Sequence, residues 1–345
     1  MVIKIYTKEF FFDRTVPYIQ LFYPFWGIPS NFNEFGMQFD EYLLNAHKYF
    51  ELSSLKDADF SVFPIDYSYV KGNPQSEKKF KEFVAISEKN GLQTIIFYFN
   101  DSTEIVPYEN LIIFRPSIFQ SSKRSNEYGM PAFCENLINK YNNGNFFLKE
   151  KNQVPSVGFV GYAAPISRSL FFTLVRTLNG KPLDLVNVSS VRRKSLKILS
   201  KNKNITTNFV MRKDFGGAIM DERTRQQQKL EFVKNIIEND YTLCARGAGN
   251  FSFRLFETLC CGRIPLFINT DCVLPFDKII DWKDYCVWVD EEELHNIDKI
   301  LLEYHNSISA SEFKEKQQKC RDLWKSHLSP DGFFSKIHEI LTGLK

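Results

Sequence analysis

The sequence lacks the features that carry a chain into or across a membrane. No apolar run approaches the roughly 20 residues that a membrane-spanning helix needs. The first residues, 1–6, are too few and too charged for a secretory signal. We therefore expect a cytoplasmic protein with at most a peripheral contact at the inner face of the membrane.

Paired cysteines are lacking as well. The seven cysteines are odd in number, none forms a Cys-x-x-Cys pair, and six of them lie after residue 240, mostly in apolar surroundings. Cysteines used in this way are typical of a reducing compartment and offer no zinc-binding pattern. We predict buried free thiols and no bound zinc.

A strong excess of one charge is also missing. The 44 Lys and Arg residues against 41 Asp and Glu leave a net charge of +3, which does not indicate a nucleic-acid-binding protein. Neither half contains the Gly-x-Gly-x-x-Gly fingerprint of a nicotinamide dehydrogenase, and no P-loop is present. Asp57-Ala58-Asp59 has the spacing of a metal-binding Asp-x-Asp motif but precedes a strand, so we expect no metal and no other cofactor.

What the first half does contain is an alternation of strand and helix patterns. The pattern predicts a helix over 77–90 that Gly91 closes, and a shorter helical stretch over 39–50. Strands are predicted at 2–6, 58–64, 94–99 and 111–114. This alternation indicates an α/β fold whose parallel sheets are covered by helices on both faces.

The second half repeats the alternation after a polar stretch rich in Asn and Lys at 141–155. The length of the chain suits two domains, and we place their boundary in this stretch, giving domains 1–150 and 151–345. Strands are predicted at 157–160, 183–188, 241–245, 264–268 and 286–289. Helices are predicted at 167–179, 226–238, 252–261, 291–305 and 311–326.

The loop after the strand at 241–245 carries the strongest chemical signal. It contains Arg246, Gly247 and Gly249, and Ser252 stands where the next helix begins. Glycine lets the backbone approach a ligand closely, and the free amides at a helix start attract an anion. Guanidinium groups at Arg246 and Arg254 match phosphate geometry. Together these features predict a phosphate or nucleotide site.

Glu257, three residues after Arg254, could accept two hydroxyl groups of a ribose. Two plainer interpretations stay open. Glycine-bearing turns occur in α/β proteins that bind nothing there, and Arg254 and Glu257 could form an exposed ion pair three residues apart on a helix.

The stretch from Tyr241 onward resembles the C-terminal half of the exostosin family of glycosyltransferases (glycosyltransferase family 47). About fifty residues carry the family's motifs in a consistent order. The matching residues are Arg246-Gly247, then Ser252, Arg254 and Glu257, then Gly262, Ile264 and Pro265, then Leu274-Pro275-Phe276, Asp281-Trp282, and Val287 with Val289. Asp57–Pro64 is similar to a segment in the family's first half, which gives weaker support.

This resemblance implies a GT-B fold, in which two Rossmann-like domains with parallel sheets face each other across a cleft. Domain 1–150 would be the acceptor side and 151–345 the donor side, and the last helix could pack back on the first domain. The implied reaction is inverting transfer from a nucleotide-sugar, in most members a UDP-sugar, without a metal. The expected acceptor is a saccharide or a lipid-linked saccharide in polysaccharide biosynthesis.

The resemblance also implies roles for individual residues. Gly247, Asn250, Ser252 and the amides around them would hold the diphosphate, Arg246 or Arg254 would neutralise the leaving group, and Glu257 would bind the ribose. Gly161 and Arg168 follow the first strand of the second domain, at a turn that would face the cleft. For that turn a plain tight turn followed by an exposed arginine is an equal alternative.

The catalytic base is expected from the first domain, because an inverting transfer needs a group that deprotonates the acceptor. Asp101 is the first candidate, Asp66 the second and Glu34 the third. The family often has a His-Asp pair where this chain has Asn100-Asp101. The family's membrane anchor and cysteine pairs are also missing, so the chain resembles a bacterial or viral type.

Two other functions remain possible from the sequence. The departure at Asn100 leaves room for a non-catalytic GT-B partner that supports another transferase. A fucosyltransferase-like GT-B enzyme that uses a GDP-sugar is the other alternative, although such enzymes usually carry Thr-Glu-Lys in the helix. The basic run that begins at Arg192-Arg193-Lys194 is interpreted as a solvated helix face.

Overall fold

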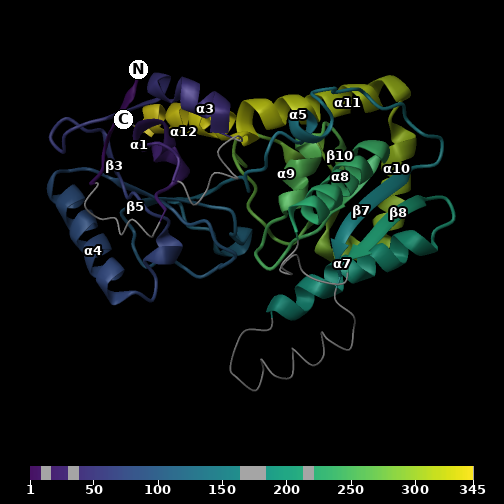
Figure 1. The fold of residues 1–345 in the computed structure, drawn as a ribbon. Coiled ribbons are helices and arrows are strands. Elements are labelled where there is room, and N and C mark those ends of the chain that lie inside the picture. The colour runs from purple at the N-terminus through teal and green to yellow at the C-terminus, as the bar shows by residue number, and fades with distance from the viewer. Residues whose placement is uncertain (9–16, 30–38, 164–183, 213–220, 345) are drawn as a thin grey trace. The chain divides into compact units, whose positions relative to one another are not determined.

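The computed structural model describes residues 1–8, 17–29, 39–163, 184–212 and 221–344 (Figure 1). The chain divides into two compact units. The first comprises Met1–Glu135, Cys272–Ile280 and Lys325–Lys345, and the second Asn136–Asp271 and Asp281–Trp324. Residues 136–150 therefore belong to the second unit, whereas the sequence analysis assigned them to the first domain. An acceptor role for one half and a donor role for the other remain predictions.

The first unit is built on a parallel sheet of six strands in the order β2-β1-β3-β4-β5-β6. The central strands β3, β4 and β5 are buried along their whole length, as expected where helices cover both faces. The strands are β1 Ile3–Tyr6, β2 Phe50–Leu52, β3 Phe60–Val62, β4 Thr94–Phe97, β5 Leu111–Arg115 and β6 Glu127–Gly129.

The longest helix of the first half of the chain, α4 (Pro74–Lys89), shows how the sequence sets its ends. Asn73 caps its start through the Ser76 amide, and Pro74 fits the first turn because a proline has no amide to leave unpaired. Gly91 ends it at φ 72°. The predicted helix over 39–50 is shorter in the structure. It consists of α3 (Asp40–Asn45) and a 3-10 turn, and Phe50 already begins β2.

The last helix of the chain, α12 (Pro330–Leu344), belongs to the first unit and lies beside α3 (Figure 1). Its Phe334 ring stacks on Tyr42 at 4.2 Å between centroids, and Phe333 packs against Phe133 at 5.4 Å. The short helix α1 (Tyr23–Trp26) also contacts α3. Aromatic side chains from both ends of the chain thus share one core.

The second unit contains a parallel sheet of five strands in the order β11-β10-β9-β7-β8. Because β7 pairs with β8 on one side and β9 on the other, the strand order reverses between β7 and β9. In open α/β sheets, ligands bind beyond the carboxyl ends of the strands at such a point. The strands are β7 Ser156–Tyr162, β8 Thr206–Arg212, β9 Tyr241–Cys244, β10 Ile264–Asn269 and β11 Val287–Asp290.

The helices of the second unit correct one prediction. The strand expected at 183–188 is wrong, because residues from 184 onward form the helix α7 (Asp184–Lys201). Its later buried residues Val191, Ser195 and Leu199 recur every four positions, which is helical spacing. The missed strand is β8. The helix expected at 167–179 lies outside the described residues. The other helices are α5 Leu137–Tyr141, α8 Glu222–Glu238, α9 Phe253–Cys260, α10 Ile297–Ser307 and α11 Ala310–Leu323.

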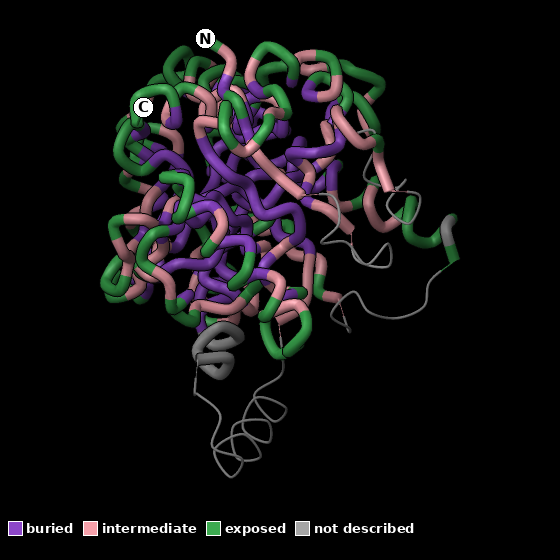
Figure 2. The backbone as a smooth tube through the Cα atoms, turned by 90° about the vertical axis from the view of Figure 1, so that its left-hand side faces the viewer, coloured by how far each residue is buried: buried purple, intermediate pink, exposed green. Residues whose placement is uncertain are grey.

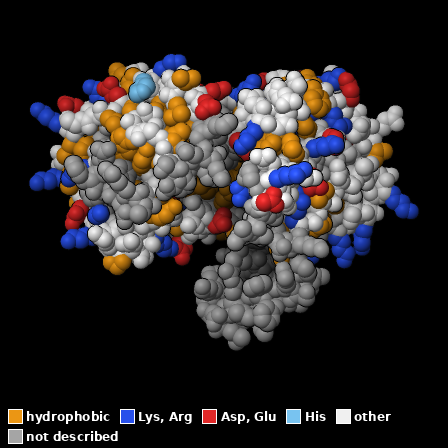
Figure 3. Space-filling view, viewed as in Figure 1, with side chains coloured by type: hydrophobic (Ala, Val, Ile, Leu, Met, Phe, Trp, Pro, Cys, Tyr) orange, Lys and Arg blue, Asp and Glu red, His pale blue; other side chains and the backbone are white. Residues whose placement is uncertain are grey.

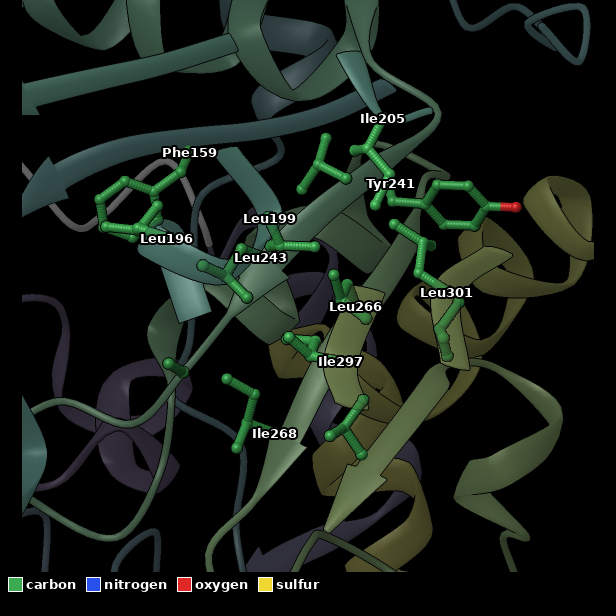
Figure 4. Close-up of a cluster of buried hydrophobic side chains, with 14 of the residues drawn as sticks. Phe159, Leu196, Leu199, Ile205, Tyr241, Leu243, Leu266, Ile268, Ile297 and Leu301 are labelled. Atoms are coloured by element: carbon green, nitrogen blue, oxygen red, sulfur yellow. The ribbon is translucent and has the colours of Figure 1, made fainter. Parts of the chain in front are cut away.

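The core of the second unit lies between the sheet and the helices α7 and α10. Leu243, Leu266 and Ile268 from the strands meet Leu199 and Leu301 from these helices (Figure 4). Buried segments fill the interior and exposed ones form the outer turns (Figure 2). The predicted α/β class with two parallel sheets is confirmed.

The cysteines and the surface agree with the composition. None of the seven cysteines forms a disulfide bond, and six of them are buried as predicted, whereas Cys272 is half-buried. One face of the molecule carries basic, acidic and apolar side chains intermixed (Figure 3). Among the helices of the described residues, none has both the length and the apolarity that a bilayer crossing requires.

Candidate active site

The candidate site lies in the second unit where β7 and β9 end, at the reversal of strand order. Gly161 and Tyr162 form the end of β7, and Arg246 follows β9 within two residues. The loop from 246 to 252 then leads into α9. Two of the residues predicted to bind the donor, Gly161 and Arg254, meet here.

Arg254 in the first turn of α9 reaches back to β7. Its guanidinium donates a hydrogen bond to the Val160 carbonyl at 2.6 Å and lies 4.5 Å from the centroid of the Phe159 ring. A Cβ atom at Gly161 would come within 2.8 Å of the Arg254 Nη2 atom, so glycine makes room for the guanidinium. Burial lowers the pKa of Arg254, and Cys244 and Glu257 partly offset this.

Arg192 on α7 is a site residue that the sequence analysis missed. Its guanidinium donates to the carbonyls of Tyr162 at 3.0 Å, Ala245 at 3.2 Å and Arg246 at 2.8 Å, so it joins the ends of β7 and β9. Only 9% of Arg192 is exposed, so the interpretation of a solvated helix face is wrong for this residue. Lys194 and Lys197 on the same helix are exposed, as expected.

The two guanidinium groups of Arg192 and Arg254 concentrate positive charge in a partly buried place. Burial, together with the smaller effect of the nearby charge of Arg254, lowers the pKa of Arg192 to about 10. Among the described residues, neither group lies within ion-pair distance of a carboxylate, and both Nε atoms are buried without a hydrogen-bond partner. Buried charge is costly without a counter-charge, so this arrangement favours binding of an anion.

The loop between β9 and α9 is fastened at Asn250 and has open space beside Gly247 among the described residues. The fully buried Asn250 side chain accepts a hydrogen bond from Thr270 Oγ1 at 2.8 Å and donates to the Asp271 carbonyl at 3.2 Å. A Cβ atom at Gly247 would meet no atom within 4 Å. Asn250 therefore positions the loop, whereas the glycine at 247 answers no steric need of the protein itself.

Ser252 occupies the N-cap position of α9, as predicted, but its hydroxyl makes no capping hydrogen bond. Amides in the first turn of a helix have no partner within the helix, and they attract negative charge. Arg246 is largely buried, and its guanidinium reaches the Ala248 carbonyl at 3.5 Å. The predicted Arg168 lies outside the described residues.

Glu257 does not pair with Arg254. Its Oε1 atom accepts a hydrogen bond from Lys229 Nζ on α8 at 2.9 Å, with side-chain exposures of 13% for Glu257 and 30% for Lys229. The plain interpretation of an exposed Arg254–Glu257 ion pair is therefore wrong, since Arg254 turns to β7 and Glu257 to α8.

Asp101 and Asp66, the two described candidates for the base, follow neighbouring strands of the first unit. Asp66 lies after β3 and accepts hydrogen bonds from the amides of Ser68 at 2.8 Å and Phe99 at 2.6 Å. Burial raises the pKa of Asp66, and these hydrogen bonds partly offset the rise. Asp101 lies after β4, is exposed, and its carboxylate has no hydrogen-bond partner among the described residues.

The loop that carries Asp101 is fastened by a buried residue that the sequence analysis did not single out. Arg115 at the end of β5 donates to the carbonyls of Ser102 and of Glu104, the latter at 2.8 Å, and pairs with Glu127 at 3.2 Å. Ser117 Oγ donates to the Asp101 carbonyl at 3.0 Å. Glu34, the third candidate, lies outside the described residues.

Arg192, Arg254 and the loop between β9 and α9 lie in a segment that matches a known domain. Residues 189–304 match the exostosin GT47 domain. The chain is 31% identical to exostosin-1 of Drosophila melanogaster over 121 residues, which are 35% of this chain and 15% of that protein. It is 35% identical over 120 residues to a "Probable glucuronosyltransferase" of Oryza sativa subsp. japonica, covering 33% of this chain and 26% of that protein.

Two solved structures align with most or all of this chain. A glycosyltransferase from Rickettsia africae ESF-5 aligns with 90% of this chain and 88% of its own, at 10% identity and a TM-score of 0.39. A sucrose-phosphate synthase from Thermosynechococcus elongatus aligns with 100% and 99% at 9% identity and a TM-score of 0.42.

The fold and the site define an α/β protein with two parallel sheets and a cationic site at the carboxyl edge of the second. The chain carries an exostosin GT47 domain and is a distant relative of the exostosins and the plant GT47 glycosyltransferases, which confirms the resemblance found in the sequence. The matched segment spans 15% of the fly exostosin and 26% of the rice protein.

Proposed function

We propose that the protein is an inverting glycosyltransferase that moves a sugar from a nucleotide-sugar, most simply a UDP-sugar, to a saccharide or lipid-linked saccharide acceptor. The observation that carries this proposal is the pair of guanidinium groups at Arg192 and Arg254, which lie at the ends of β7 and β9 and have no carboxylate partner within the described part of the chain. They occur inside the segment that matches the GT47 domain.

The charges of the site fit the donor's diphosphate. The Arg254 guanidinium and the amides that begin α9 would hold the phosphate oxygens, with Gly247 allowing a close approach of the backbone. Arg192 would hold the loop in place through the Arg246 carbonyl. The Glu257 carboxylate would accept hydrogen bonds from the ribose hydroxyls.

The reaction in this proposal is a single displacement. The acceptor hydroxyl attacks the anomeric carbon from the face opposite the diphosphate, and the bond from that carbon to the diphosphate breaks with inversion. The proton of the hydroxyl passes to a carboxylate, and the negative charge on the departing diphosphate is stabilised by the fixed cations.

Asp101 is the proposed base. Its carboxylate is exposed and uncommitted among the described residues, whereas both oxygens of Asp66 already accept backbone amides. Asp66 keeps one property that suits a base, because burial raises its pKa. In this proposal Arg115 and Ser117 fix the loop that presents Asp101.

The proposal includes three further expectations. Fixed guanidinium groups supply the charge that a metal would supply in other transferases, so transfer should proceed without one. No nucleic-acid partner is expected, because the net charge of the chain is only +3. The cytoplasmic location expected from the sequence remains part of the same proposal.

The test is thermal unfolding of the full chain with UDP, GDP, CMP and ADP, free and sugar-linked. A ligand that binds only the folded protein raises the Tm, by an amount that follows its concentration. We expect a rise with UDP compounds that disappears in Arg254→Ala and Glu257→Ala. Lys234→Ala is the matched control, because it removes a positive charge from α8 at a side chain that is 70% exposed.

Other outcomes favour the alternatives. A rise with GDP compounds alone favours the fucosyltransferase-like enzyme. No rise with any nucleotide contradicts the proposal and favours a non-catalytic partner. With the donor identified, Asp101→Asn should still bind the nucleotide but lose sugar transfer, whereas retained transfer would move the role of the base to Asp66 or Glu34.

A further inference from the structure

The relation between Arg254, Glu257 and Lys229 points beyond the proposed function, on which this inference rests. Arg254 and Glu257 stand three residues apart on α9, a spacing at which oppositely charged side chains are neighbours and attract each other. They nevertheless point to different partners. Arg254 donates to the Val160 carbonyl at 2.6 Å, and Glu257 accepts from Lys229 at 2.9 Å.

The ion pair between Lys229 and Glu257 lies in surroundings that strengthen the attraction between its charges. Lys229 Nζ lies 5.1 Å from the centroid of the Phe232 ring, and the Arg254 guanidinium lies 5.9 Å from the same centroid. With exposures of 30% for Lys229 and 13% for Glu257, the ion pair is largely shielded from water. Attraction between charges is stronger there than at an open surface.

The charge balance of the site depends on Lys229. Two cations, Arg254 and Lys229, stand near one carboxylate, that of Glu257, and Arg192 is a further cation near Arg254. Lys229 compensates the carboxylate, so the charges of both arginines remain for a ligand. Without Lys229, the carboxylate of Glu257 would be left in a shielded place, and Arg254 is the cation next to it along the helix.

We propose that Lys229 is a positioning residue that keeps Glu257 away from Arg254, so that the Arg254 guanidinium stays available to the diphosphate. The same contact holds the Glu257 carboxylate in the place from which it would receive the ribose. Lys229 acts here through Glu257 and need not touch the ligand.

The test uses inorganic pyrophosphate, which has no ribose and therefore does not depend on Glu257 for its own contacts. Its affinity for the full chain is measured by titration calorimetry at fixed ionic strength. We expect Lys229→Met to bind pyrophosphate about tenfold more weakly, since a charge-assisted hydrogen bond contributes on that scale. Lys229→Arg should bind like the unaltered protein, and Lys234→Met on the same helix is the matched control.

The decisive variant combines Lys229→Met with Glu257→Gln. Once the carboxylate is neutral it no longer competes for Arg254, so pyrophosphate affinity should return to within about threefold of the unaltered protein. If Lys229 had a merely structural role, the loss of pyrophosphate affinity would persist in the double variant, because this variant also lacks the lysine.

Three results would overturn the inference. Full pyrophosphate affinity in Lys229→Met shows that Glu257 does not compete for Arg254. A double variant as weak as Lys229→Met shows that Lys229 acts by contact or by folding. In these first two cases the unaltered protein still binds pyrophosphate, so the proposed function is not contradicted. If the unaltered protein binds neither pyrophosphate nor UDP, the proposed function fails and the inference fails with it.

Discussion

At the scale of single residues, two glycines differ in whether the packing of the protein requires a residue without a side chain. Gly158 in β7 faces Asn235, whose Oδ1 atom would lie 2.6 Å from an added Cβ. Gly247 in the candidate site would place a Cβ in open space. Only the first glycine is explained by packing, and in the proposed function the second allows a ligand to approach the backbone.

These two glycines give a matched prediction. Gly158→Ala should lower the Tm clearly, because its Cβ meets the backbone and side chain of Asn235. Gly247→Ala should leave the Tm of the free protein nearly unchanged but reduce the rise that UDP produces. Thermal unfolding with and without UDP measures both. Equal UDP stabilisation in Gly247→Ala and the unaltered protein would remove Gly247 from the proposed site.

The residues of the candidate site differ in how far the sequence could reveal them. Gly247 and Arg254 could be identified because they stand in a loop and helix start of recognisable chemistry. Arg192 could not, since it belongs to a run of basic residues that looks the same whether it faces water or the core. Its three carbonyl partners come from Tyr162, Ala245 and Arg246, about 30 to 50 positions away.

At the scale of elements, a buried histidine connects α10 to the amino end of the second sheet. His305 Nε2 lies 2.9 Å from the Asn152 carbonyl, and its Nδ1 lies 2.9 Å from the Tyr241 hydroxyl. A carbonyl only accepts, so Nε2 donates, and in the neutral ring Nδ1 accepts from the tyrosine. The side chain is 1% exposed, and burial lowers its pKa.

This contact predicts a pH dependence of stability. Because the pKa of His305 is lower in the folded chain than its usual value of about 6.5, the unfolded chain takes up the proton first as the pH falls. The stabilisation by the neutral ring is therefore complete above that value and is lost toward acid. The Tm advantage of the unaltered protein over His305→Gln should narrow between pH 7.5 and 5.5.

The exposed His295 serves as the control for this experiment. His295→Gln should follow the unaltered protein across the same range. A Tm gap between the unaltered protein and His305→Gln that stays constant or widens toward acid would contradict the assignment of a neutral ring at His305.

Helices and strands were predicted well where the apolar residues of a segment follow a single helical or strand-like spacing. The strands at 94–97 and 264–269 and the helix α4 have clear patterns and agree with the structure within a few residues. The segment from 183 to 188 alternates apolar and polar residues, which is strand-like spacing, yet a helix begins at Asp184. The edge strand β8 is only partly buried, so its pattern is weak.

At the scale of the whole molecule, the path of the chain was the least predictable feature. Residues 272–280 and 325–345 belong to the first unit, although each of these two ranges follows a segment of the second unit in the sequence. Local patterns predict helices and strands but contain no information on partners hundreds of residues away. The contact of Phe334 with Tyr42 is such a case, since either aromatic residue could have filled another core.

The return of α12 leads to a prediction on stability. Phe334 is 1% exposed, stacks on Tyr42 and lies near Phe97 of β4. Replacing a buried phenylalanine by alanine costs about 3–5 kcal/mol, so Phe334→Ala should lower the Tm strongly. Leu344→Ala on the same helix should not, because Leu344 is 51% exposed.

The same variant tests which part of the molecule the last helix completes. Amide hydrogen exchange reports local opening, and in Phe334→Ala it should accelerate first in β4 and β5, which lie in the unit that α12 joins. Peptides from β9 and β10 should keep their protection, since these strands belong to the other unit. Exchange that accelerated equally in β4 and β9 would mean that the two units unfold as one, so that the C-terminal helix stabilises the whole chain.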